Sequence, residues 1–405
     1  MTATLTTSPA PALAARMALL SGEGALDVFR RAQELERAGR PIIHLELGAP
    51  DVDAPPHAVE AAVRALRDGD ARYVAPQGLP ELREAIARDV RSRGVDADAA
   101  RVLVTPSAKT AVFYALLAAV GPGDEVLVPD PGFPIYASVV RFAGGVPVGY
   151  AHDADGAPDL DDVAARITSR TRALALNAPG NPTGGALGAE GLARLAELAR
   201  RHDLVLVADD IYSRLVYDGE RAPEARAPSA AAFAPERTLL VDGFSKTYAM
   251  TGYRLGYLVA PAPWVERLVT LAVNGHTCVP PFVQRAGVAA LEGPQDAVAA
   301  QVAAYRARRD VLVGALNAIP GVRCPAPAGA FYAFPDLSEA LAAAGLTSRA
   351  FADRLLEHYG VAVIDGAAFG PRGEGHLRLS FASARSDLDA AAARLRDAVA
   401  ALRIR

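Results

Sequence analysis

The sequence predicts an α/β fold with a mostly parallel sheet, joined to a smaller α+β domain. Short apolar runs alternate with helical patterns through the middle of the chain, as in residues 192–201, where apolar residues recur about every 3.6 positions. The runs are apolar throughout instead of alternating with polar residues, which is typical of strands covered on both faces. After about residue 290 a long helical stretch and a Pro/Gly-rich turn replace this pattern. At 405 residues the chain also exceeds one average domain.

The predicted elements follow in order from the N-terminus. Residues 1–12 are small, polar and Pro-containing, and we expect them to be disordered. Helices are expected over 25–38, before the sheet, and over 297–317, after it. The strands of the sheet are expected at residues 102–105, 125–128, 173–177, 204–208, 238–242 and 256–260.

Composition argues against several functional classes. The net charge of −4 comes from 42 basic and 46 acidic residues without a basic block, so we expect no nucleic-acid partner. No stretch approaches the ~20 apolar residues of a membrane span, and no signal peptide is recognisable, so we expect no membrane partner. Cys278 and Cys324 lie outside any CxxC or Cys/His cluster, and the histidines lack a metal-binding spacing. We therefore expect no disulfide framework, no metal and a reducing, cytoplasmic location.

Polar residues follow three of the predicted strands. Ser107 comes after the first strand, Asn181 after the third and Asp209 after the fourth. In open α/β sheets, ligands bind outside the carboxyl ends of the strands. The sequence therefore predicts a ligand site at this edge of the sheet.

The segment VDGFSKTYAMTGYRLGYLVAP, residues 241–261, holds the most informative lysine. Lys246 comes just after a predicted strand, and Arg254 lies eight residues further on. A lysine attacks an aldehyde only when part of its population is neutral, and burial beside another cation produces that state. Alone, such a lysine is more often a surface charge. Two further motifs accompany it, NAPGNPTG at 177–184 and VADDIY at 207–212.

Together and in this order, these motifs resemble the class I aminotransferase family, fold type I of the pyridoxal-phosphate enzymes, from about residue 20 to the C-terminus. The resemblance implies an aminotransferase-like large domain with a mostly parallel seven-stranded sheet between helices, plus a smaller α+β domain. It also implies a homodimer with shared active sites and pyridoxal 5'-phosphate held by Lys246 as a Schiff base. The expected parts are a disordered N-terminus at 1–12, a segment at 13–47 packing on the small domain and cleft, a large cofactor-binding domain at 48–295 and a small domain at 296–405.

The resemblance assigns roles around the cofactor ring. Asp209 matches the carboxylate beside the pyridine nitrogen, where its charge keeps the ring protonated and electron-withdrawing. Tyr212 matches the tyrosine that hydrogen-bonds the phenolic oxygen, and Asn181 resembles the residue that touches both that oxygen and the substrate carboxylate. Phe133 occupies the position of the aromatic that stacks on the ring, which contributes about 0.5–1.5 kcal/mol beyond burial. Asp210 stands where the family usually has Glu, and we assign it no catalytic role.

Binding of the phosphate requires donors at a helix start and a cation. The run TPSAKTAVF puts Ser107, Ala108 and Lys109 between a strand and an apolar helix, where the family binds the phosphate. On its own this run is a common helix N-cap. Arg254 matches the family's phosphate arginine, and Tyr73 resembles the tyrosine that reaches the phosphate from the neighbouring subunit.

The resemblance also places the substrate. Arg378, in GHLRLSFA, matches the arginine that clamps the α-carboxylate, a task that suits a guanidinium because its fork pairs two oxygens at once. A salt-bridged surface arginine is the alternative. Gly48, in LELGAPD, resembles the glycine that lines the carboxylate pocket, where a side chain would obstruct approach. Residues 21–29, SGEGALDVF, are expected near the mouth of the cleft, with glycines that permit closure.

Two positions depart from the family pattern. Many members have a serine three residues before the lysine, whereas this chain has Gly243, with Ser245 nearby as the candidate substitute. One subgroup of aspartate aminotransferases uses a partner-subunit arginine for a second carboxylate, and the matching position here is Asn274. That route does not support a dicarboxylate substrate, although Lys109 or another arginine could serve. The loop NGHTCVPP offers instead His276, Thr277 and Cys278.

The reaction implied by the resemblance moves the amino group of an α-amino acid to a 2-oxo acid. The substrate amine displaces Lys246, and the freed lysine then moves the α-proton as base and acid. One alternative keeps the cofactor but ends in elimination, cyclisation or annulation, or oxidation, because the fold does not fix the outcome. A second alternative is a non-catalytic regulator, but the ~40 residues before LELGAPD are too few for a winged helix and lack a basic patch.

Overall fold

The computed structural model describes residues 12–22, 24–217 and 226–402. Residues 1–11 of the expected disordered N-terminus lie outside this part of the chain. The central sheet has seven strands in the order β2-β8-β7-β6-β5-β3-β4. All run parallel to one another except β8, which is antiparallel to both β2 and β7. The predicted α/β class with a mostly parallel seven-stranded sheet is confirmed. These strands are β2 (Val102–Thr105), β3 (Glu125–Pro129), β4 (Val146–Tyr150), β5 (Thr171–Asn177), β6 (Val205–Asp209), β7 (Thr238–Gly243) and β8 (Gly256–Val259).

Both faces of this sheet are buried under helices, as the continuous apolar runs predict. Along β6, Val205 and Val207 join one apolar cluster, which includes the helix that follows β2. The alternate residues Leu206 and Ala208 join a second cluster, which includes the helix between β5 and β6. The helices of this part of the chain are α2 (Pro56–Arg67), α3 (Pro80–Arg91), α4 (Ala108–Ala119), α5 (Ile135–Phe142), α6 (Leu160–Ala165), α7 (Ala189–Arg201), α8 (Val265–Gly275) and α9 (Pro281–Glu292).

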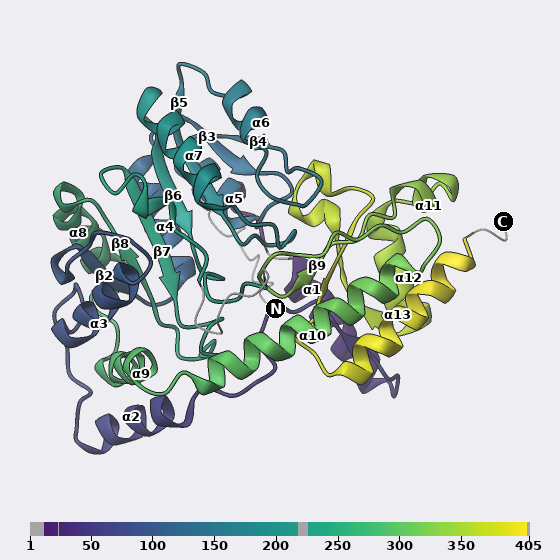
Figure 1. The fold of residues 1–405 in the computed structure, drawn as a ribbon, viewed down its shortest axis with the longest axis horizontal. Helices are drawn as coiled ribbons and strands as arrows, with labels where there is room; N and C mark the ends of the chain where they lie inside the picture. The colour runs from purple at the N-terminus through teal and green to yellow at the C-terminus, as the bar shows by residue number, and fades with distance from the viewer. Residues whose placement is uncertain (1–11, 23, 218–225, 403–405) are drawn as a thin grey trace, which may run out of the picture.

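A second, smaller sheet lies in the C-terminal part of the chain. It is antiparallel, in the order β11-β12-β9, and Figure 1 shows it beside the C-terminal helices, with the long α10 running toward them from the side of the large sheet. Its elements and the helices around it are α10 (Asp296–Asn317), β9 (Tyr332–Ala333), α11 (Ser338–Ala343), α12 (Ser348–Tyr359), β10 (Val361–Ala362), β11 (Ile364–Asp365), β12 (Leu377–Ser380) and α13 (Arg385–Ala400).

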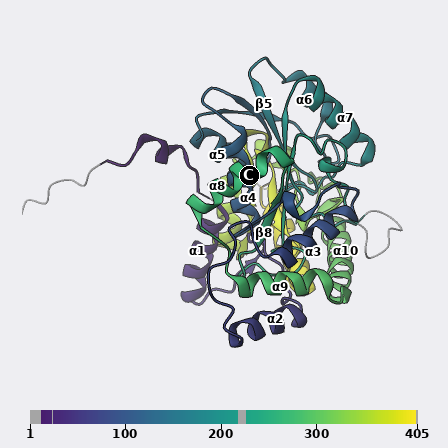
Figure 2. The ribbon, with the colours of Figure 1, turned by 90° about the vertical axis from the view of Figure 1, so that its left-hand side faces the viewer.

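The N-terminal segment packs on this C-terminal part. The helix α1 (Gly24–Arg37) buries Val28 and Ala32 in a cluster with Leu356 of α12. The strand β1 (Ile43–His44) pairs in parallel with β10. Residues 12–22 extend to one side of the body in Figure 2, where the backbone N–H of Ser21 donates to Ser138 Oγ of α5 at 2.9 Å. Six short 3-10 helices complete the description: Ala15–Leu19, Ala99–Arg101, Ala230–Ala232, Ala262–Trp264, Gly366–Phe369 and Pro371–Gly373.

All six strands expected from the sequence are present, with ends displaced by a residue or two. The seventh, β4, was not expected from the apolar runs. Its sequence VPVGY contains a proline and a glycine, and most of its residues are partly exposed because it is an edge strand. In the described part of the chain, no helix is both long and apolar enough to cross a membrane.

Candidate active site

A cavity of about 320 Å³ opens at the carboxyl ends of the central strands. Asn177 ends β5 and Asp209 ends β6, and both line it, as does Lys246 just beyond β7. Every residue predicted for the site lines this cavity except Tyr73. The predicted residues brought together are Gly48, Ser107, Ala108, Lys109, Phe133, Asn181, Asp209, Tyr212, Ser245, Lys246, Arg254 and Arg378.

The carboxylate of Asp209 is buried and held from two sides. The hydroxyl of Tyr136 donates to Oδ2 at 2.7 Å, and the backbone N–H of Ile211 donates to Oδ1 at 3.2 Å. Burial raises the pKa of Asp209 to about 6, although the hydrogen bond from Tyr136 works in the opposite direction. At neutral pH this end of the cavity therefore presents a negative charge, which suits a protonated pyridine nitrogen. Tyr136 was not predicted, because it reads as an ordinary core residue of α5.

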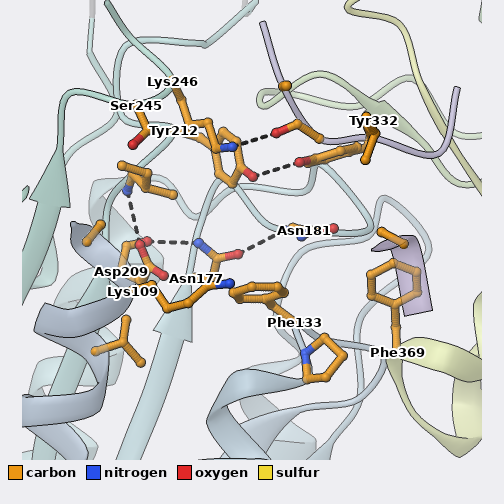
Figure 3. Close-up of a pocket in the computed structure, with 18 of the residues that line it drawn as sticks. Lys109, Phe133, Asn177, Asn181, Asp209, Tyr212, Ser245, Lys246, Tyr332 and Phe369 are labelled. Carbon is orange, nitrogen blue, oxygen red and sulfur yellow. Dashed lines mark hydrogen bonds between the residues drawn. The ribbon is translucent and has the colours of Figure 1, made fainter. Parts of the chain in front are cut away.

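Asn177 connects the backbone of Asp209 to that of Asn181 (Figure 3). Its side-chain nitrogen donates to the backbone oxygen of Asp209 at 2.9 Å, and its side-chain oxygen accepts from the backbone N–H of Asn181 at 2.8 Å. The side-chain oxygen of Asn181 in turn accepts from Arg378 Nη1 at 3.2 Å. Asn181 thus connects Asn177 to the guanidinium of Arg378.

Lys246 meets Gly48 at the cavity, where its Nζ donates to the backbone oxygen of Gly48 at 2.5 Å. A Cβ on Gly48 would lie 2.2 Å from the hydroxyl oxygen of Tyr332. The glycine is therefore required by Tyr332 as well as by the substrate approach that the sequence suggested. Lys246 and Lys109 are the only two lysines of the whole sequence, and both line the cavity.

Tyr332 is a second lining residue that sequence reasoning missed. Its hydroxyl lies 2.9 Å from the hydroxyl of Tyr212, and both rings are buried. The guanidinium of Arg378 sits between two rings, 4.6 Å from the centroid of Tyr332 and 5.0 Å from that of Phe369. Burial raises the pKa of Tyr212 well above its ordinary value, so its phenol keeps its proton and can donate.

The opposite end of the cavity is built to receive an anion. Ser107 caps α4, with its Oγ accepting from the backbone N–H of Thr110 at 3.2 Å, and the helix start faces the cavity. Arg254 lies beside it in a left-handed conformation at φ 54°. Gly256 permits this packing, because a Cβ there would lie 2.2 Å from the backbone nitrogen of Ala108. Ser245 also lines this cavity.

Gly243, the departure from the family pattern, lies at the end of β7 in tight surroundings. A Cβ there would lie 3.0 Å from the backbone oxygen of Leu255 and 3.1 Å from the Cα of Gly256. A serine would have to displace backbone, which accounts for the glycine at this position.

The lining residues fit pyridoxal phosphate. The lining combines a carboxylate, a helix start with a nearby guanidinium, and a primary amine. A second guanidinium, that of Arg378, is available for a carboxylate. This arrangement on a mostly parallel seven-stranded sheet defines a pyridoxal-phosphate enzyme of fold type I.

Tyr73 lies outside the cavity, as do the residues considered for the substrate side chain, Asn274, His276, Thr277 and Cys278. The ring of Tyr73 is 87% exposed. Asn274 donates to the backbone oxygen of Thr270 within α8, and it is exposed. His276 packs in its own loop, stacked on Tyr114 with its Nδ1 2.9 Å from the Tyr114 hydroxyl, and burial lowers its pKa.

A buried ion-pair network underlies the site. Arg93, with a side chain 1% exposed, donates to Asp210 at 2.6 Å and to Asp242 at 3.3 Å. Ser213 also donates to Asp242, at 3.1 Å. Asp210 follows the carboxylate of Asp209 directly, and Asp242 lies four residues before Lys246. Asp210 therefore has a structural partner, consistent with its having no assigned chemistry.

Comparison with known proteins gives the family. Residues 40–395 match the family "aminotransferase class I and II". The arginine–pyruvate transaminase of Pseudomonas aeruginosa is 38% identical over 365 residues, covering 89% of this chain and 91% of that protein. The aspartate aminotransferase of Pyrococcus horikoshii is 35% identical over 393 residues, covering 96% and 97%. The solved structure of Thermus thermophilus aspartate aminotransferase with maleate matches with a TM-score of 0.88 and 38% identity, covering 96% of this chain and 100% of that chain.

The chain belongs to the class I and II aminotransferases. It is a pyridoxal-phosphate-dependent transaminase, and its substrates are an amino acid and a 2-oxo acid. The expected activity and cofactor are confirmed.

Proposed function

We propose that Lys246 carries the cofactor and moves the α-proton, while Arg378 and Asn181 hold the substrate α-carboxylate. The observation that supports this proposal is the position of the Lys246 amine, in one cavity with the carboxylate of Asp209 and the guanidinium of Arg378. When bound, pyridoxal phosphate supplies an electron sink for the bond that breaks at the α-carbon. The protein then has to orient that carbon, accept its proton and exclude water.

The remaining roles follow from the same geometry. Asp209, held by Tyr136, stabilises a positive ring nitrogen, and Tyr212 donates to the phenolic oxygen. Phe133 covers the ring. The helix start at Ser107 and Ala108, with Lys109, Ser245 and Arg254 beside it, binds the phosphate.

Because the sequence contains only two lysines, a chemical label on the cofactor-bearing lysine can be assigned without ambiguity. Borohydride reduction of the holoenzyme, followed by peptide mass analysis, is expected to place the cofactor label on Lys246, since Lys109 is the one other lysine of the sequence. Lys246→Ala is expected to abolish turnover while leaving the melting temperature close to that of the wild-type apoprotein. A label on Lys109, or activity retained by Lys246→Ala, would contradict the assignment.

We further infer that Lys109 contacts the substrate side chain and contributes to substrate selectivity. Lys109 lines the cavity with its Nζ 5.5 Å from the centroid of the Phe133 ring, and a cation there favours an acidic side chain. In Lys109→Met the kcat/KM for aspartate is expected to fall at least about tenfold more than that for alanine, because only aspartate loses a charge pair. An equal loss for both amino acids would instead assign Lys109 to the cofactor phosphate alone.

We propose that the active site is completed in a homodimer. The proposal is supported by the exposure of the Tyr73 ring, which is unusual for so large an aromatic side chain and lies apart from its own cavity. A mixed dimer of Tyr73→Ala and Lys246→Ala chains is expected to regain one working site from two inactive or impaired parents. Failure of the mixture to exceed both parents would contradict a shared site.

The division of the chain and its location are likewise proposed. We place the boundary between the large and small domains at residues 295 and 296, where α10 begins and leaves the central sheet. Residues 13–47 are assigned to the small domain and the cleft, in keeping with the packing of α1 on α12. A cytoplasmic location is consistent with two free cysteines, Cys278 and Cys324, in the described chain.

A further inference from the structure

Two ionisable side chains, those of His44 and Glu46, lie behind the substrate end of the cavity. Their segment runs extended between β10 and β12, because Leu45 N donates to the backbone oxygen of Ala362 at 3.0 Å and Ser380 N donates to that of Leu45 at 2.8 Å. Successive residues of an extended strand point to opposite faces, so His44 and Glu46, which are two residues apart, share one face. Their side chains meet there, with His44 Nδ1 2.7 Å from Glu46 Oε1.

Glu46 is fully buried, at 0% exposure, directly beside the proposed carboxylate clamp. Its backbone oxygen accepts a hydrogen bond from Arg378 Nη2. Its second carboxyl oxygen, Oε2, has no hydrogen-bond partner among the residues that the structure describes. Burial raises the pKa of the Glu46 carboxyl, and the hydrogen bond and charge of His44, together with the charge of Arg378, act in the opposite direction and favour the carboxylate.

His44 lies between two carboxylates. Its Nδ1 faces Glu46, its Nε2 is 3.1 Å from Glu36 of α1, and its ring meets the edge of Phe29 at 5.8 Å. Burial opposes protonation of the imidazole, but the hydrogen bonds and charges of the two carboxylates outweigh it, so the pKa of His44 is raised. Of the two strands that flank this segment, β10 contributes only Val361 and Ala362, which carry no charge, and β12 contributes one charged residue, Arg378.

We propose that Glu46 and His44 are positioning residues for the α-carboxylate clamp. The backbone oxygen of Glu46 holds the guanidinium of Arg378, and protonated His44 offsets the charge of the Glu46 carboxylate. The inference rests on the role of Arg378 proposed above. While His44 is protonated, the charge of Arg378 is available to the substrate carboxylate. Once His44 loses its proton, the carboxylate of Glu46 competes with the substrate for the same guanidinium.

The sign of the pH effect follows from the direction of the His44 shift. Because its pKa is raised, the imidazole keeps its proton to a higher pH than a free histidine and loses it as the pH rises further. The KM for a 2-oxo acid should then rise about three- to tenfold with increasing pH, as expected for one altered charge pair beside a buried site. The kcat should change little with this titration, because Lys246 bonds to the backbone oxygen of Gly48 and Asp209 is held by Tyr136.

The experiment measures kcat and KM of the holoenzyme for pyruvate and for 2-oxoglutarate from about pH 6 to about pH 9, the range that brackets histidine titration. A 2-oxo acid is the right probe because it carries no amine that titrates in this range. The variants are Glu46→Gln and His44→Gln. The matched control is Glu34→Gln, which makes the same chemical change on α1 at a side chain that is 51% exposed and bonded to Arg30.

Glu46→Gln is expected to remove the rise in KM with pH, and His44→Gln to hold KM at the high wild-type level throughout. Glu34→Gln is expected to follow the wild type. A rise in KM that persists in Glu46→Gln would overturn the inference, as would an equal, pH-independent fall in kcat and kcat/KM, since that would mark a purely structural role. Arg378→Lys tests the clamp independently of His44 and Glu46. An unchanged KM in that variant would show that Arg378 does not hold the substrate carboxylate.

Discussion

The buried network of Arg93, Asp210 and Asp242 gives a prediction whose size can be worked out from the structure. The three side chains are 1%, 4% and 6% exposed, so water cannot solvate either carboxylate if the guanidinium is removed. Arg93→Met keeps an unbranched apolar stem and removes the charged guanidinium. Breaking a buried ion pair by removing one partner costs about 3–5 kcal/mol, because the remaining charge is left uncompensated.

This cost converts to a measurable shift in melting temperature. For a chain of 405 residues, an unfolding entropy of about 2 cal/mol/K per residue gives a drop of about 4–6 °C for the apoprotein at pH 8. Without the guanidinium the pKa of both carboxyls rises further, so the two groups take up protons in the folded variant more readily as the pH falls from 8 to about 5. The folded variant then binds protons that the unfolded chain has released. Its loss of melting temperature relative to the wild type therefore becomes smaller as the pH falls.

Thermal unfolding at the two pH values provides the assay, with two comparisons. Arg30→Met removes an arginine that is 62% exposed and paired with Glu34 on the same helix, so it should shift the melting temperature by less than about 1 °C. Adding Asp210→Asn and Asp242→Asn to Arg93→Met should restore much of the lost stability, since no uncompensated charge remains. A wild-type melting temperature for Arg93→Met at pH 8, or a deficit that does not change with pH, would refute the reasoning.

Three further outcomes follow from the site. Tyr136→Phe removes the hydroxyl that donates to Asp209 at 2.7 Å, so kcat should fall by about 10- to 100-fold, more at low pH, and an unchanged kcat would contradict this. Gly48→Ala puts a Cβ 2.2 Å from the Tyr332 hydroxyl, so the KM for both substrates should rise; a wild-type KM would show that Tyr332 moves freely. Burial raises the pKa of Asp209 to about 6 and that of Asp242 to about 7, so the folded apoprotein holds protons that the unfolded chain loses near pH 4, and its stability should decrease between about pH 4 and pH 7. Melting temperatures across that range test this, and Asp242→Asn should flatten the profile.

Local patterns in the sequence were sufficient for most of the fold. Strands such as β6 and β7 are buried on both faces, so each contains a continuous apolar run, with its acidic residue at or near the carboxyl end, and the run itself predicts the strand. The edge strand β4 pairs with a neighbouring strand on one side only, and its proline and partly exposed residues interrupt the apolar run. The order of motifs then located the residues around the cavity, because each motif is a loop whose position after a strand is fixed by the fold.

The residues that were missed act through contacts between distant parts of the chain. Tyr136 and Asp209 are 73 residues apart, Tyr212 and Tyr332 are 120 apart, and no local pattern connects either pair. In each case a buried tyrosine hydroxyl needs a partner, but the sequence alone does not say which one. Tyr332 is the clearest example, since a tyrosine in a short apolar strand reads as core.

The choice between lysine and arginine follows the chemistry of each position. Of the 42 basic residues, only Lys109 and Lys246 are lysines, and both line the cavity. A guanidinium keeps its proton under all physiological conditions, which suits fixed charges such as those of Arg93 and Arg378. A residue that must give up a proton to act as a nucleophile and base cannot be an arginine. Lys246→Arg should therefore retain charge and much of the packing yet lose turnover as completely as Lys246→Ala, whereas a charge-only role at this position would leave it active.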